Sequence, residues 1–403
     1  MRGLLIVNPQ ATTTTGNSAD LAIRSLAGLV DLDVEHTRYR GHARELAAAA
    51  RGELVIVLGG DGAINEAVNG IMGRQTEPAG QETAGAQTAP LLAVIPGGGG
   101  NVFARALGLP LDTVAAIAKI KEVMEAGRYR TIGLGLAGDR YFTFSAGLGM
   151  DAEVVREVER LRAGGHRETA ALFAWAILRR YASGTDRRTP ALTLEQDGQQ
   201  AIPDLFMTAI TNRSPWTYIR GRAVLPVPNP DFNSGLDVLA LRKLRATTIF
   251  SAVGQMLVSR RRPPRGRHLL TVTGQQALTV RSIRPIAFQV DGDYLGETEA
   301  VKFHFVPHAL RVVALPPAAP RAKCDRSDIK LRRTAAVASC ACQGMLKGLT
   351  RCPARGRLAR AISPGGPGFD DTASPSGGTS GSRPRLGGFL LGIINGSGET
   401  WAE

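Results

Sequence analysis

The chain is 403 residues long, which is enough for two to four domains with cores of useful size. Hydrophobic residues make up 43% and charged residues 21% of it, so the composition is globular and excludes collagen, coiled-coil and low-complexity classes. No apolar run reaches the ~18 residues that span a bilayer. The apolar stretch after Met1 is also shorter than the ~7–15 residues of a secretory signal. We therefore expect a cytoplasmic protein.

The net charge of +14 favours partners that carry phosphate, such as nucleotides, nucleic acid or an anionic membrane surface. Residues 321–403 hold 13 Lys and Arg against 6 Asp and Glu, so half of the excess lies there. All four cysteines lie in this segment too, at spacings that match no paired zinc motif. The segment is rich in Gly, Pro and Ser, and we predict that residues 319–403 form a basic, disordered tail.

Strand and helix patterns alternate along the first 128 residues, which predicts a parallel sheet with helices on both faces. The expected strands are 4–7, 32–36, 54–58 and 91–95, and the expected helices are 18–29, 43–50, 63–72, 102–107 and 114–125.

Short β runs then dominate, and they predict a second, β-rich domain over 129–307. Its expected strands are 131–137, 141–146, 191–196, 206–211, 236–241, 269–272, 277–280, 286–290 and 301–306. One more strand, 310–315, is expected after this domain. Its expected helices are 151–162, 169–181 and 247–259.

The first candidate site is a glycine turn, Gly59-Gly60-Asp61-Gly62, between an apolar strand and a helix. Ligands of open α/β sheets bind at the carboxyl ends of strands, and glycines let backbone N–H groups approach a phosphate. A carboxylate in such a turn serves a metal, a hydroxyl proton or a cationic neighbour. The alternative is that Asp61 only caps its helix.

Two further loops change the balance between these alternatives. Gly97-Gly98-Gly99-Gly100-Asn101 also follows a buried strand and precedes a helix. The loop after the first strand carries Asn8, Thr12 and Thr13. Three such loops at successive strand ends predict a cradle for the phosphates of a nucleotide. Neither the Gly-x-Gly-x-x-Gly fingerprint nor the Walker A pattern is present, which argues against a Rossmann or P-loop protein.

At this point the sequence resembles the diacylglycerol kinase catalytic domain superfamily, in its bacterial soluble branch, which is related to sphingosine kinases. The matching motifs come in order over residues 2–316. They are 7–9, 59–62 continued to 70, 96–110, 145–155 and 290–293.

The resemblance implies an N-terminal α/β nucleotide domain like that of phosphofructokinase and NAD kinase. A β-sandwich-like domain would follow, with the active site in the cleft between them and the last strand, within 308–318, returning to the first domain. The implied activity is transfer of the γ-phosphate of ATP, with Mg²⁺, to a lipid hydroxyl. The favoured reaction converts diacylglycerol to phosphatidic acid.

The resemblance also implies roles for particular residues. Asp61 would help to place Mg²⁺ or the attacking hydroxyl, Asp293 would be the general base, and Asp291 would support it. A second, structural Mg²⁺ would involve Asp231, Ser234 and Leu236. The implied contacts to ATP are Asn8, Thr12, Thr13, Gly59, Gly60, Asp61, Gly62, Asn65, Glu66, Gly97, Gly98, Gly99, Gly100 and Asn101.

Four positions depart from the family pattern. Asp293 stands where the family has Glu, which shortens the reach of the base and leaves open whether Asp291 or Asp293 takes the proton. Gly98 to Gly100 offer no hydroxyl where the family has Thr or Ser. Ala63 replaces Thr, and Ser234 replaces a carboxylate, which weakens the expected structural Mg²⁺ site.

The expected partners are a diacylglycerol-like lipid and an anionic membrane surface, reached from the inner face of the plasma membrane. No nucleic-acid partner is expected, and a homodimer stays open. The basic run 260–267 would dock to lipid or form a solvated loop, and the helix around Trp175 would line an acyl cleft or belong to the core. The alternatives are a kinase for a sphingoid base or another lipid alcohol, an NAD kinase, and a catalytically silent nucleotide or membrane sensor.

Overall fold

The computed structural model describes residues 1–12, 14, 16–73, 89–166, 170–219, 221–228, 231–258 and 262–315. The described residues form one compact unit within Met1–Pro317. The basic tail expected over 319–403 lies outside the described residues, as do 316–318. None of the helices that the structure describes is both long enough and apolar enough to cross a bilayer.

The first lobe is a parallel sheet in the order β4-β3-β1-β2. Strands β3 and β4 are buried at every position, as expected of strands covered on both faces. The strands are β1 (Arg2–Val7), β2 (Asp31–His36), β3 (Leu54–Gly59) and β4 (Leu91–Pro96).

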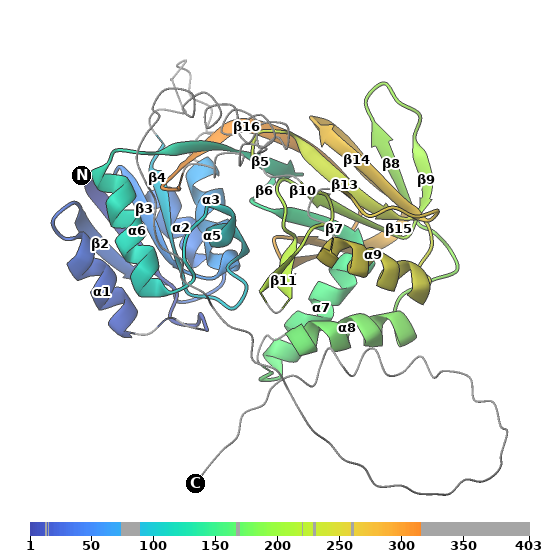
Figure 1. Cartoon of the computed structure of the whole chain (residues 1–403), viewed down its shortest axis with the longest axis horizontal. Helices are drawn as coiled ribbons and strands as arrows, with labels where there is room; N and C mark the ends of the chain where they lie inside the picture. The colour runs from blue at the N-terminus through green and yellow to red at the C-terminus, as the bar shows by residue number, and fades with distance from the viewer. Residues whose placement is uncertain are drawn as a thin grey trace, which may run out of the picture. The chain divides into compact units, whose positions relative to one another are not determined.

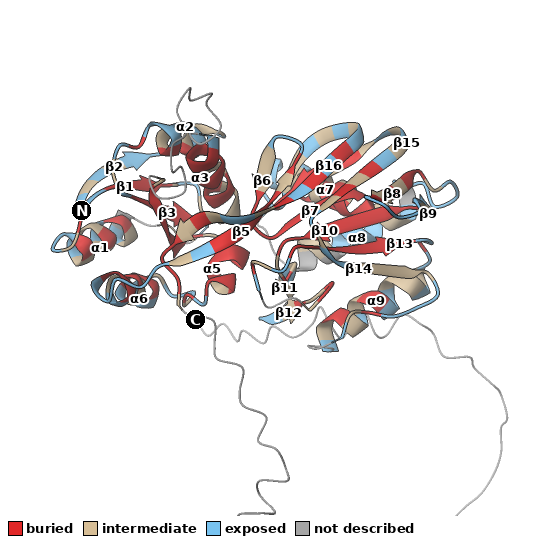
Figure 2. Ribbon diagram, turned by 90° about the horizontal axis from the view of Figure 1, so that it is seen from above, coloured by how far each residue is buried: buried red, intermediate tan, exposed pale blue. Residues whose placement is uncertain are grey.

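Helices cover both faces of this sheet, because α1 packs beside α6 on one face and α2 beside α3 on the other (Figure 2). Short α5 follows β4 directly. The helices are α1 (Gly16–Leu26), α2 (His42–Ala49), α3 (Asp61–Gly73), α5 (Val102–Ala106) and α6 (Thr113–Glu125).

The second lobe is built from antiparallel strands that continue the same sheet (Figure 1). A separate hairpin joins β11 (Thr217–Ile219) to β12 (Arg222–Val224). The other strands are β5 (Arg130–Ala137), β6 (Arg140–Phe142), β7 (Ser145–Gly149), β8 (Leu192–Gln196), β9 (Ile202–Leu205), β10 (Met207–Thr211), β13 (Leu236–Leu241), β14 (Leu269–Gln275), β15 (Ala277–Val290) and β16 (Asp293–Val312).

Three helices complete this lobe, α7 (Met150–Ala163), α8 (Ala170–Ser183) and α9 (Ala246–Val258). A single apolar cluster joins all three to β10 and β13, through residues such as Val154, Ala176 and Ile249. All three helices therefore lie against the sheet through one core.

Two predicted pairs of short strands are each one long strand. The runs 277–280 and 286–290 belong to β15, and 301–306 with the first half of 310–315 belongs to β16. Register shifts interrupt the pairing of both strands. In β16 one shift falls between Val306 and Leu310, where His308 has a positive φ of 50°. At its end β16 pairs in parallel with β4, since Val312 lies opposite Leu92.

Other boundaries differ from the prediction as well. The run 141–146 divides into β6 and β7, and β9, β11 and β12 have no counterpart among the predicted strands. These missed strands are only three or four residues long, too short for a periodic pattern. The predicted fold class, an α/β nucleotide domain followed by a β-rich domain, is confirmed.

Candidate active site

The three predicted loops meet at one edge of the first lobe. Strands β1, β3 and β4 run in parallel and end together, so the chain leaves each of them at the same edge. A Cβ added at Gly98 would lie 2.7 Å from the Cα of Gly60, and one at Gly97 would lie 3.1 Å from the Cα of Gly59. A Cβ on Gly59 would in turn lie 3.3 Å from the Cβ of Asn8. Only glycine permits this close approach of the two turns.

Two asparagines that were predicted to bind ATP shape these loops with their side chains. Asn101 is the N-cap of α5, with a positive φ of 47°. Its Oδ1 accepts a hydrogen bond from the Gly98 N–H at 2.9 Å, and its Nδ2 donates to the Gly98 carbonyl. The Oδ1 of Asn8 accepts from the Gln10 N–H at 2.9 Å. Both side chains therefore set the course of the backbone that would face a phosphate.

The loop after β1 also contributes threonines. Thr12 is exposed, and Thr13 lies outside the described residues. Thr14, which the sequence reasoning missed, has a buried Oγ1 without a hydrogen-bond partner, and a Cβ added at Gly97 would lie 2.5 Å from it. Its signal was present in the run of four threonines, but nothing in that run distinguished one hydroxyl from the next.

Asp61 links the two glycine turns. It is the first residue of α3, yet its carboxylate accepts hydrogen bonds from the backbone N–H groups of Val102, at 2.9 Å, and Phe103, at 3.0 Å. It thus caps α5, the neighbouring helix, rather than only its own. Each carboxylate oxygen has more than one acceptor site. Asp61 therefore fits the carboxylate that a Mg²⁺ ion at the phosphates would need.

Asp291 forms the hairpin turn between β15 and β16 together with Gly292. Both residues have positive φ, 47° and 84°, as an Asp-Gly type I′ turn requires. The Asp291 side chain is buried, and burial raises its pKa while its hydrogen bonds oppose that shift. The carboxylate accepts five hydrogen bonds of 2.7 to 3.0 Å, from Asn65 Nδ2, Thr143 N, Thr143 Oγ1, Phe144 N and Ser145 N. Asp291 therefore anchors the turn.

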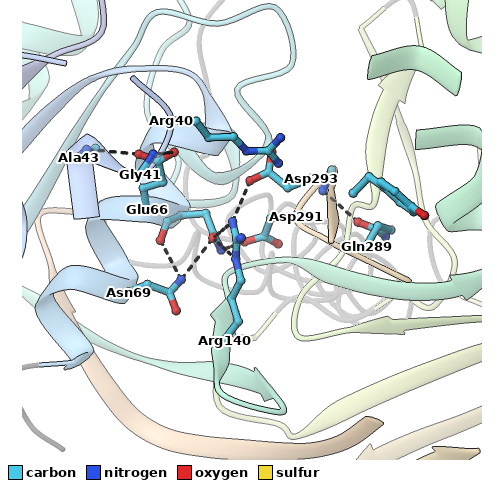
Figure 3. A network of polar contacts seen from close by, with 12 residues as sticks. Arg40, Gly41, Ala43, Glu66, Asn69, Arg140, Gln289, Asp291 and Asp293 are labelled. Atoms are coloured by element: carbon cyan, nitrogen blue, oxygen red, sulfur yellow. Dashed lines mark hydrogen bonds and ion pairs between the residues drawn. The ribbon is translucent and has the colours of Figure 1, made fainter. Parts of the chain in front are cut away.

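Asp293, two residues later, faces the glycine turns. A Cβ added at Gly62 would lie 3.7 Å from its Oδ1. Its side chain is 20% exposed, and its two oxygens pair with Arg140 Nη2 at 2.7 Å and Arg40 Nη2 at 3.4 Å (Figure 3). Of the two predicted candidates for the base, Asp293 is the one that a substrate can reach. No motif pointed to either arginine.

Asn65 and Glu66 bind protein groups instead of facing the glycine turns. The Glu66 carboxylate accepts from the backbone N–H groups of Gly41, at 2.8 Å, and Ala43, at 3.2 Å, and so caps α2. Asn65 is fully buried, and its Nδ2 donates to the Tyr141 carbonyl as well as to Asp291. The Asn65 contacts tie α3 to the second lobe, and those of Glu66 tie it to α2. Their predicted contacts with ATP stay a prediction.

Asp151 is a second buried carboxylate near the hairpin turn. Its Oδ2 accepts from Gln289 Nε2 at 2.7 Å, and Gln289 Oε1 accepts from the Gly292 N–H at 3.0 Å (Figure 3). Burial raises the pKa of Asp151 to about 7, and the hydrogen bond from Gln289 opposes this. Asp151 and Gln289 thus support the turn that precedes Asp293.

The raised pKa of Asp151 predicts that stability falls as the pH rises. The folded protein keeps this proton up to about pH 7, whereas the unfolded chain loses it near pH 4. Between these values folding is progressively disfavoured, by as much as ~4 kcal/mol. We expect Asp151→Asn to remove this slope, so that urea unfolding at pH 5 and pH 8 differs less than in the wild type. Equal slopes in the two proteins would contradict the assignment.

The residues expected to hold a structural Mg²⁺ ion are not arranged to bind one. Asp231 Oδ1 pairs with Arg130 Nη2 at 3.3 Å, so the only carboxylate of the set already faces a cation. The Ser234 hydroxyl donates to the Asp231 carbonyl, and Leu236 is paired within the β13–β14 ladder. Within the described ranges, no three His, Cys, Asp or Glu side chains form a group that could hold a metal ion.

Comparison with solved structures identifies the fold. Among solved structures, a putative diacylglycerol kinase from Bacillus anthracis str. Sterne is 22% identical, with a TM-score of 0.59 over 79% of this chain and 98% of that chain. This likeness shows the fold. The fold is thus similar to that of bacterial proteins solved as diacylglycerol kinases.

The sequence comparisons give the family. Residues 2–132 match the model of the diacylglycerol kinase catalytic domain. A diacylglycerol kinase of Bacillus subtilis is 29% identical over 265 residues, 63% of this chain and 76% of that protein. A probable lipid kinase, YegS-like, of Chromohalobacter salexigens is 32% identical over 176 residues, 42% of this chain and 48% of that protein. The chain therefore carries a diacylglycerol kinase catalytic domain and is a lipid kinase, as its motifs predicted.

Proposed function

We propose that the protein transfers the γ-phosphate of ATP to the free hydroxyl of diacylglycerol and yields phosphatidic acid. The observation that carries the proposal is the meeting of Gly60 and Gly98 at one sheet edge, with the Asp293 carboxylate beside Gly62. Backbone N–H groups of the two turns suit the phosphates of ATP, and a carboxylate next to them suits the hydroxyl. The names of the relatives favour diacylglycerol as the lipid.

In the proposed reaction Asp293 accepts the proton of the lipid hydroxyl. The hydroxyl oxygen forms a bond to the γ-phosphorus, the bond between that phosphorus and the β–γ bridging oxygen breaks, and ADP leaves. Asp291 does not react, since its five hydrogen bonds hold the turn from which Asp293 projects. Asp61 would hold Mg²⁺, which supplies neutralisation of phosphate charge when bound.

Transfer of label from γ-³²P-ATP with Mg²⁺ tests this function directly. The full chain is given diacylglycerol, a sphingoid base or an acylated glycolipid in mixed micelles. We expect labelled phosphatidic acid as the main product. A labelled sphingoid base or glycolipid instead would replace the proposed substrate with another lipid alcohol. Bound ATP without any labelled lipid would favour the silent sensor.

The close approach of the turns predicts a strong effect of Gly98→Ala. The new Cβ would meet the backbone of Gly60 at 2.7 Å, so one turn must shift by a large fraction of an ångström. We expect ATP affinity, measured by calorimetry, to fall at least ~10-fold, because the N–H groups no longer converge. Gly28→Ala is the matched control, since no atom lies within 4 Å of its added Cβ. Equal affinity in both variants would exclude the Gly98 turn from the nucleotide site.

We further propose that α8 and α9 bring the enzyme to an anionic membrane. Apolar side chains project from their outer faces, with Trp175 47%, Leu178 50%, Phe250 56% and Val258 82% exposed. Arginines and lysines flank them in sequence: Arg179, Arg187, Arg188, Lys243, Arg245, Arg265 and Arg267. Such a surface combines apolar insertion with about 1 kcal/mol of attraction per basic residue near anionic lipid. Of the basic run 260–267, residues 260 and 261 lie outside the described residues.

Vesicle sedimentation tests this surface. We expect the protein to bind vesicles of phosphatidylglycerol and phosphatidylcholine more tightly than pure phosphatidylcholine, and Phe250→Ser to weaken that binding several-fold. Ile283→Ser is the matched control, because Ile283 is 74% exposed on β15, a different element. Identical binding by the two variants would exclude α9 from the membrane contact.

A further inference from the structure

Two arginines from separate elements converge on the Asp293 carboxylate (Figure 3). Arg140, the first residue of β6, places Nη2 2.7 Å from Oδ2, and Arg40, in the loop between β2 and α2, places Nη2 3.4 Å from Oδ1. Each oxygen of the proposed base therefore already has a guanidinium partner. A lipid hydroxyl that approaches either oxygen must therefore share it with a guanidinium.

The Arg140 guanidinium is oriented by a buried group. Its Nε and Nη2 donate to Asn65 Oδ1 at 3.0 and 2.8 Å. Asn65 is itself fully buried and fixed by its contacts with Asn69 and the Tyr141 carbonyl. Asn65 thus anchors the edge of the guanidinium that carries Nε and Nη2, and the same Nη2 also donates to Asp293 Oδ2. The other oxygen of Asp293, Oδ1, lies beside Gly62 of the phosphate turn. Arg140 is 24% exposed, so a ligand can approach it.

Arg40 is held less tightly. Its side chain is 58% exposed, and besides Asp293 its Nη2 pairs with Glu159 Oε1, at 3.5 Å. Two guanidiniums and two carboxylates, those of Asp293 and Glu159, therefore gather beside the glycine turns. The group is electrically neutral as it stands.

We propose that Arg40 and Arg140 form the site of the γ-phosphate, and that binding of this phosphate draws their guanidiniums away from Asp293. This inference rests on the function proposed above and assigns two residues to it. The guanidinium group of arginine forms bidentate hydrogen bonds with phosphate oxygens as well as with carboxylates. A terminal phosphate also carries more negative charge than a carboxylate. The released Asp293 is then ready to accept the proton of the lipid hydroxyl. The exchange itself makes and breaks no covalent bond.

The exchange gives the two arginines a second role in the transfer step. Charge spreads over the γ-phosphate oxygens in the transition state, and guanidiniums aimed at those oxygens stabilise it. The same two groups thereby keep Asp293 occupied until a triphosphate is present. An enzyme built this way distinguishes ATP from ADP by the anion that reaches Arg40 and Arg140.

Equilibrium binding of nucleotides tests the inference without any lipid. Calorimetry on the full chain with Mg²⁺ compares ADP with β,γ-imido-ATP, which keeps a terminal phosphate and is not hydrolysed. We expect the wild type to prefer the triphosphate, and Arg40→Met and Arg140→Met each to reduce that preference about 10-fold, the loss of one charged hydrogen bond. Affinity for ADP should change less than ~3-fold. Thermal unfolding of each variant checks that it folds.

Arg281→Met is the matched control. Arg281 pairs with Glu195 at 2.9 Å between β15 and β8, and it is about as exposed as Arg40. This variant should keep the wild-type preference. If Arg40→Met and Arg140→Met also keep it while both nucleotides bind, the γ-phosphate role is overturned and the arginines only position Asp293. A wild type that binds neither nucleotide would overturn the proposed function, and this inference with it.

Discussion

Asp293→Asn is expected to lower the rate of phosphate transfer by about 10²- to 10⁴-fold while the protein stays folded. An amide cannot accept the proton of the lipid hydroxyl, but it preserves the size of the side chain. Because the hydrogen bonds of Asp291 hold the turn independently of Asp293, the fold should not depend on this charge. The measurement is kcat for labelled lipid formation, with circular dichroism and ATP affinity recorded on the same samples.

Two further variants make this result specific. Asp293→Glu should keep substantial activity, because it restores the carboxylate that the family carries with one more methylene. Asp139→Asn is the matched control, since Asp139 lies exposed in the neighbouring β5–β6 turn. An Asp293→Asn protein with a rate within threefold of the wild type would show that another group takes the proton. Asp61 would then be the next candidate.

The glycine turns could be predicted from the sequence because their signal is local. A buried strand, a glycine cluster and a helix start stand within about ten residues of one another, twice, and parallel strands must end at one edge. The function of Asp61 as the cap of α5 could not be predicted in the same way. Its partners Val102 and Phe103 are 41 and 42 residues away, and only the fold brings them together.

The arrangement around Asp293 depends even more on distant contacts. Arg140 is 153 residues from Asp293 in the chain and Asn65 is 226 residues from Asp291, and neither pair leaves a periodic or motif signal. The long strands β15 and β16 were divided in the prediction for a related reason. Register shifts at their irregular points break the alternation from which a strand is predicted, although the strand continues in the sheet.

Asp291→Ala is expected to destabilise the protein by at least ~3 kcal/mol. The substitution removes an acceptor that serves two side chains and three backbone N–H groups, and Thr143, Phe144 and Ser145 would keep buried donors without it. The β15–β16 turn would also lose its tie to α3 through Asn65. Urea unfolding at constant pH measures the loss.

Kinase activity should fall with this variant as well, for a reason that separates Asp291 from Asp293. Asp291 acts by holding the turn, so the activity of Asp291→Ala should fall in proportion to the loss of folded protein. Asp139→Ala should cost less than ~0.5 kcal/mol, as expected for an exposed turn residue. A loss at Asp291 no greater than that at Asp139 would mean that water replaces the carboxylate, and the five hydrogen bonds would then not be what holds the turn in place.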